Sequence, residues 1–252
     1  ASALERAFLA DGRAAMAQAL QRSLVPGTLP KIDGVELAAL YRPFSPNDEI
    51  GGDFYGVFPH GDGSWSVAIG DVSGKGPDAA AVMGLAAHTL RASGRYESRP
   101  GAVLRALNDV LIGAERVSAE RFCTVCQMRL RPGPDHLRVT LCLAGHPLPY
   151  LARADGSTEH VGMTGTILGS FADPTLHDVS LDLPAGDALI ASTDGLVERR
   201  DGGVEAGERQ LRACLSDCRG RPADEIVRVI EDRLLTDALL DDDAALVVVR
   251  RP

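Results

Sequence analysis

Short apolar runs with strand-like alternation recur along the chain from Val35 onward. They are rich in β-branched or aromatic residues and are bounded by glycine, proline or aspartate, as strands commonly are. Turns of hairpin length at 59–64, 131–135 and 184–187 favour antiparallel pairing of neighbours. We expect about nine strands, at 35–44, 53–58, 65–72, 123–130, 137–144, 148–153, 176–183, 187–193 and 244–250.

Helical periodicity is present in two pairs of segments that separate these strands. The four segments are 78–93, 100–114, 207–218 and 223–235. The resulting order is strands, two helices, strands, two helices and a last strand, which differs from strict βαβ alternation. It predicts an α+β fold with mostly antiparallel sheets, and this many strands in one domain indicate two packed sheets. Asp78, which follows Pro77, is expected to cap the first of the helices.

An amphipathic helical pattern also covers residues 3–24. The turn-rich segment 26–34 separates it from the first strand. We interpret residues 1–30 as a linker or regulatory helix that forms a homodimer or docks on the domain, and 31–252 as the main domain. The alternative is an ordinary helix packed on its own domain.

Composition narrows the class of protein. The 252 residues carry a net charge of −9 and a pI near 5.1, which argues against a nucleic-acid or anionic-membrane surface. No apolar stretch is long enough to span a membrane, and the first residues lack the apolar core of a signal peptide. Five cysteines cannot all pair, so we expect a reducing, cytoplasmic setting. Buried apolar cysteines are favoured over a zinc site made from Cys123, Cys126, Cys214 and Cys218.

Acidic residues stand where four apolar strands begin or end. They are Asp53 in EIGGDFYG, Asp71 in AIGDVSGKG, Asp194 in IASTDGLVE, and Asp242 and Asp243 in LDDDAALVVV. Each alone is typical of a turn or a helix cap. As a converging group they would repel one another, and a divalent ion would remove that cost. Oxygen ligands without histidine or cysteine select Mg²⁺ or Mn²⁺, and two such ions can share a hydroxide that attacks phosphorus.

Other motifs are weaker. Arg42 could contact a substrate phosphate, or form a salt bridge to a neighbouring acid. His146 is a turn residue near the site or a proton shuttle. DVSGKGP is no P-loop, because Gly76 follows the lysine where serine or threonine is required. GGD at 51–53 resembles the start of the diguanylate cyclase signature, but Phe54 follows instead of glutamate.

Taken in order, GGDFYG, GDVSGKG, AGHPLPY, ASTDGLVE and DDDAALVVVR resemble the bacterial PPM-type serine phosphatases of the SpoIIE/RsbU class, in the PP2C-like superfamily. The resemblance runs from about Leu20 to Arg250. It implies a PP2C-like four-layer α-β-β-α sandwich of two mostly antiparallel sheets flanked by helices, with a dimetal site at one end. The first motif commonly ends in aspartate in this family, whereas Gly56 stands here.

The resemblance also implies metal ligands, namely Asp53, Asp71, the carbonyl of Val72, Asp194 and Asp242, with Asp243 as the alternate to Asp242. Asp71 would bridge two Mg²⁺ or Mn²⁺ ions, and the carbonyl of Val72 would complete one of them. Asp194 and Asp242 would hold the second ion. Asp53 would lie at the first, directly or through water.

The implied function is that of a protein serine/threonine phosphatase, in which the metal ions bind the phosphoserine oxygens and activate the attacking water. Substrates in this class are typically phosphorylated anti-anti-sigma proteins of the STAS type, whose dephosphorylation frees a sigma factor. The stretch LQRSLVPGTLP resembles the segment that often joins such domains to an upstream sensor. The alternative is a catalytically silent PP2C-like module that binds a partner in the same pathway.

Overall fold

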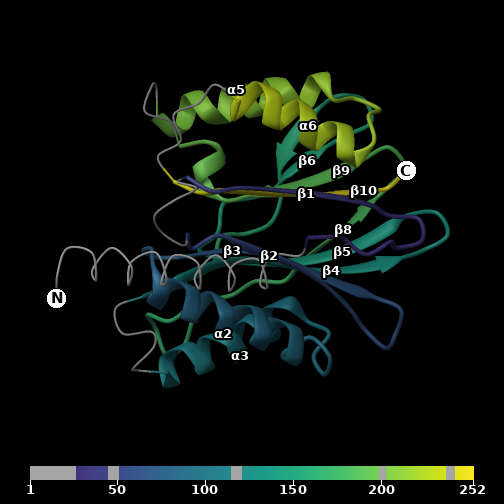
Figure 1. Cartoon of the computed structure of the whole chain (residues 1–252). Coiled ribbons are helices and arrows are strands. Elements are labelled where there is room, and N and C mark those ends of the chain that lie inside the picture. The colour runs from purple at the N-terminus through teal and green to yellow at the C-terminus, as the bar shows by residue number, and fades with distance from the viewer. Residues whose placement is uncertain (1–26, 45–50, 115–120, 199–202, 237–241) are drawn as a thin grey trace.

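Two antiparallel five-stranded sheets form the centre of the molecule (Figure 1). The computed structural model describes residues 27–44, 51–114, 121–198, 203–236 and 242–252. In spatial order, the first sheet contains β1 (Glu36–Arg42), β10 (Ala244–Arg250), β9 (Ala188–Ser192), β6 (Tyr150–Ala152) and β7 (Thr158–His160). The second contains β2 (Phe54–Pro59), β3 (Trp65–Val72), β4 (Cys123–Pro132), β5 (Leu137–Ala144) and β8 (Val179–Leu183).

Helices cover the outer face of each sheet, so the layers follow the order α-β-β-α (Figure 1). The pair α5 (Gly203–Asp217) and α6 (Ala223–Leu234) lies on the first sheet. The pair α2 (Pro77–Ser93) and α3 (Pro100–Gly113) lies on the second. A short 3₁₀ helix, η1 (Asp194–Leu196), follows β9. This arrangement confirms the predicted α+β sandwich of two antiparallel sheets flanked by helices (Figure 1).

Burial on both faces explains why central strands read as continuous apolar runs rather than alternating ones. In β10, Val247 and Val249 pack between the two sheets. Leu246 and Val248 point the other way and pack under α5 and α6. Each sheet therefore contributes to two cores, and together the layers enclose three apolar clusters.

Most elements agree with the sequence-based expectations, and two details do not. Strand β7 was not expected, because its three residues TEH carry no apolar alternation; it forms by pairing with β6. Asp78 is not the cap of α2: Gly76 occupies that position with a φ of 89°, Pro77 begins the helix, and Asp78 lies in its first turn. The predicted helix at 3–24 lies outside the described residues, and the domain division at residue 30 stays a prediction.

All five cysteines are buried and free, as the interpretation of them as small apolar residues requires. Within the described part of the chain, no helix is both long and apolar enough to cross a membrane.

Candidate metal centre

Antiparallel pairing brings the acidic motifs to one end of the sandwich. Asp53 precedes β2, whose first residue pairs with Gly70 near the end of β3, so Asp53 and Asp71 lie close together. In the other sheet, β9 ends just before Asp194 and pairs with the start of β10, which follows Asp242 and Asp243. The four motifs that sequence analysis selected therefore do meet, two from each sheet.

A hydrogen bond joins the two halves of the site. The hydroxyl of Thr193 donates to Asp53 Oδ2 at 2.6 Å, and both residues are buried. The same Thr193 oxygen accepts the backbone N–H of Ala245 at 2.8 Å. Thr193 thus fixes the orientation of the Asp53 carboxylate and ties the start of β2 to β10.

Burial and mutual repulsion act on the carboxylates of this end. Burial, and next the charge of Asp71, raises the pKa of Asp53 well above its ordinary range. Burial, and next the charge of Asp194, raises the pKa of Asp71 to about 7. Burial raises the pKa of Asp194 and of Asp243 too, and the negative charge of Asp242 adds to both increases. Shifts in this direction report desolvation together with mutual repulsion of the ionised forms.

Two glycines make room for these oxygens. A Cβ atom at Gly52 would overlap the carbonyl oxygen of Val72 and Oδ1 of Asp71, and one at Gly51 would overlap the Asp243 carboxylate. The backbone of Gly52 also accepts the N–H of Val72 at 3.1 Å. Glycine is therefore required in GGD because the backbone passes directly over the proposed oxygen ligands.

The neighbouring aspartates of the DDD run occupy different environments. Asp243 is buried, and its carboxylate accepts the N–H of Phe44 at 2.7 Å and the hydroxyl of Tyr41 at 3.2 Å. The side chain of Asp242 is 52% exposed and forms an ion pair with Lys75, Nζ to Oδ1, at 2.8 Å. Of the two, Asp242 has the more accessible carboxylate.

The residue types gathered at this end fit a hard divalent cation. In the described ranges, no three His, Cys, Asp or Glu side chains already surround one point as metal ligands. Instead Asp53, Asp242 and Asp243 are each held by a protein donor. Carboxylate and carbonyl oxygens that carry negative charge are the ligands that Mg²⁺ and Mn²⁺ prefer, so these residue types fit such an ion.

Arg42 and His146 lie in well-defined environments. Arg42 Nη2 forms an ion pair with Glu231 Oε1 at 2.6 Å, which is the salt bridge considered as the alternative to phosphate binding. Burial lowers the pKa of His146 to about 3, so its ring is neutral at pH 7, and Nδ1 is 3.1 Å from the Thr124 hydroxyl. A neutral, buried ring fits a packed residue better than a proton shuttle.

The departure from the family motif at Gly56 has a local explanation. A Cβ atom at Gly56 would overlap the ring of Phe58. The three atoms nearest to such a Cβ all belong to this ring, and none belongs to the aspartates of the candidate site. The roles of Thr193, Tyr41 and Lys75 were not expected from the sequence. Thr193 lies inside the quoted motif ASTDGLVE, so its position next to Asp194 was the available signal.

Comparison with known proteins decides the family. The sequence model of the family described as Stage II sporulation protein E (SpoIIE) matches residues 61–252. The chain belongs to the SpoIIE family. Membership of this family, together with its similarity to a phosphoserine phosphatase, supports the class of protein serine phosphatases.

Individual relatives agree with this family. Phosphoserine phosphatase RsbU of Bacillus subtilis is 28% identical over 235 residues, which are 92% of this chain and 68% of RsbU. The RsbU and RsbW domains of Rv1364c from Mycobacterium tuberculosis match with a TM-score of 0.75 and 30% identity, over 88% of this chain and 62% of that one. RsbX, solved in complex with magnesium, has the same fold, with a TM-score of 0.66 and 15% identity over 89% of this chain and 99% of RsbX.

Proposed function

We propose that this SpoIIE-family domain is an active, metal-dependent protein serine/threonine phosphatase whose substrate is a phosphoserine of a regulatory protein, of the anti-anti-sigma (STAS) type. The observation that carries the proposal is the acidic end of the sandwich, where carboxylates from both sheets meet with raised pKa values. Keeping such a group is unfavourable for the fold unless cations bind there.

In this proposal each group has a distinct role. The ligands for two ions, Mg²⁺ or Mn²⁺, are the carboxylates of Asp53, Asp71, Asp194 and Asp242 and the carbonyl of Val72, with Asp243 as the alternate. When bound, the ions supply the Lewis acidity that lowers the pKa of water and neutralises phosphoryl oxygens. In this proposal the protein itself contributes no nucleophile, which agrees with the burial of the His146 ring.

The surrounding residues hold the carboxylates in place. Thr193 orients Asp53 through its hydroxyl. The hydroxyl of Tyr41 and the backbone N–H of Phe44 hold the Asp243 carboxylate, whereas the neighbouring Asp242 carboxylate is exposed to solvent. Rigid support of this kind fixes ligand direction, as outer partners do at metal sites generally.

The substrate class rests on the relatives rather than on the site geometry. RsbU is named a phosphoserine phosphatase, and Rv1364c joins an RsbU domain to an RsbW domain. We infer that this chain acts in a comparable cytoplasmic sigma-factor pathway, under the control of an upstream sensor domain or regulatory protein joined through residues 1–30.

Phosphate release from defined substrates tests this proposal. We expect Mn²⁺-dependent release from a serine-phosphorylated STAS-type protein and far slower release from a phosphotyrosine peptide. Equal rates on both would contradict the assigned substrate class. Tight binding of the phosphoprotein without turnover at any Mn²⁺ concentration would instead support the silent partner-binding module.

A further inference from the structure

Lys75 is held at the edge of the acidic end by an unusual loop. It lies between Gly74 and Gly76, whose φ angles are 85° and 89°, three residues after Val72 and just before helix α2. Side chains other than glycine rarely adopt such angles, so the loop conformation around Lys75 is set by its two neighbours. At Gly74 a Cβ atom would also overlap the guanidinium of Arg121.

The ammonium group of Lys75 contacts two elements of the site. Its Nζ lies 2.8 Å from Asp242 Oδ1 and 4.6 Å from the centroid of the Phe44 ring. Phe44 in turn donates its backbone N–H to Asp243. The Lys75 side chain is 31% exposed, so it lies at the solvent-accessible edge of the acidic end.

Two arginines of the described residues near this end, Arg42 and Arg121, have partners of their own. Arg42 is paired with Glu231 at 2.6 Å, on the side of α6. Arg121 Nη1 donates to the carbonyl of Ser73 at 2.6 Å and so supports the loop itself. Lys75 forms an ion pair with a proposed metal ligand, Asp242, and its flexible side chain carries a compact point charge.

We propose that Lys75 binds the phosphoryl group of the substrate, and that it competes with the metal ion for Asp242 when the site is metal-free. This inference rests on the proposed function and adds a residue to it. When Asp242 serves as a ligand, its ion pair with Lys75 is given up, and the ammonium group then faces the site next to Phe44. Lysine is well suited to this role, since it contacts phosphate as a compact charge.

Calorimetric titration of inorganic phosphate into the full chain in Mg²⁺ tests the proposal without requiring turnover. We expect Lys75→Met to raise the phosphate dissociation constant about tenfold or more, the range for loss of a hydrogen bond to a charged group. Lys75→Arg keeps the charge and should retain most of the affinity. Lys31→Met, at the other lysine of the chain, is the matched control and should bind phosphate like the wild type.

A Mn²⁺ titration without phosphate separates this role from a merely structural one. Lys75→Met should bind Mn²⁺ at least as tightly as the wild type, because Asp242 has lost a competing cation. Weaker Mn²⁺ binding by this variant, or an unchanged phosphate dissociation constant, would overturn the proposal. A wild-type chain that binds phosphate but never hydrolyses a phosphoester would contradict the proposed function alone.

Discussion

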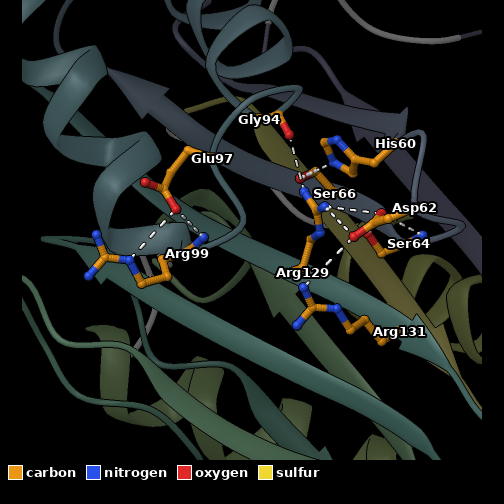
Figure 2. A network of polar contacts seen from close by, with 9 residues as sticks. All are labelled: His60, Asp62, Ser64, Ser66, Gly94, Glu97, Arg99, Arg129 and Arg131. Atoms are coloured by element: carbon orange, nitrogen blue, oxygen red, sulfur yellow. Dashed lines mark hydrogen bonds and ion pairs between the residues drawn. The ribbon is translucent and has the colours of Figure 1, made fainter.

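Aspartates beside the two ends of β3 are held in opposite electrostatic settings. Asp62, in the turn before the strand, accepts hydrogen bonds from the side chain and backbone of Ser64 and lies 3.2 Å from Arg129 Nη2 (Figure 2). The Ser64 donors, followed by Arg129, hold the pKa of Asp62 well below its usual range. At the other end, burial and neighbouring carboxylates raise the pKa of Asp71 to about 7.

Arg129 is the central residue at the Asp62 end of β3, where the charges are paired. It is buried, and its second guanidinium nitrogen donates to the carbonyl of Gly94, at the end of α2, at 3.1 Å (Figure 2). It thereby ties β4 to the β2–β3 hairpin and to a helix. Arg131 adds a longer contact to Asp62 at 3.8 Å. The difference between the two ends teaches that paired charges support the fold around Asp62, whereas we attribute the mutually repelling carboxylates around Asp71 to the proposed metal site.

The largest effect expected from this contrast is stabilisation by metal at one end only. At a Mn²⁺ concentration 100 times the dissociation constant, the free energy of unfolding should rise by about 2.7 kcal/mol. Thermal melts with Mn²⁺ and with chelator measure this. Asp71→Asn should lose the stabilisation, while Asp62→Asn should keep it. An equal rise in Asp71→Asn would show that the ion binds elsewhere.

A smaller effect concerns stability without metal. Asp62→Asn leaves the buried Arg129 without its carboxylate partner, so the free energy of unfolding should fall by about 1–3 kcal/mol. Asp71→Asn removes one of several repelling charges and should not destabilise the chelated protein. Urea unfolding in chelator compares the two variants directly. Comparable losses in both would remove the distinction between the ends.

The smallest expected effect concerns how the free energy of unfolding changes at acidic pH. Because the pKa of Asp62 is lower in the folded than in the unfolded chain, its contribution is present above about pH 4 and is lost as pH falls through the folded value. Asp62→Asn should therefore have a flatter decline of stability below pH 4 than the wild type. Parallel acid-unfolding curves for the two proteins would contradict this sign.

The fold could be predicted from the sequence to a large extent, since strand-length apolar runs and paired helical segments report burial directly. Where local signal is absent, the prediction failed: β7 depends on its partner β6 rather than on its own residues. The cap of α2 was assigned to Asp78 because an acidic residue is a common cap. The structure uses Gly76, whose positive φ no propensity argument reveals.

For the site, the acidic motifs were identified from the sequence, but their support was not. Thr193 contacts Asp53 across 140 positions, and Tyr41 contacts Asp243 across 202. Such distant pairs leave no local pattern. The different environments of Asp242 and Asp243 also follow from tertiary packing, because adjacent residues share most of their local sequence.

Hydrolysis of p-nitrophenyl phosphate with and without Mn²⁺ tests the central claim most directly. The account predicts turnover that requires Mn²⁺, stops in excess chelator and falls at least about a thousandfold in Asp194→Asn, since several kcal/mol of Lewis-acid stabilisation are lost. Asp182→Asn, which changes an exposed aspartate paired with Arg138 at 2.8 Å, should retain wild-type turnover. Turnover that survives chelator, or that persists in Asp194→Asn, would contradict the account.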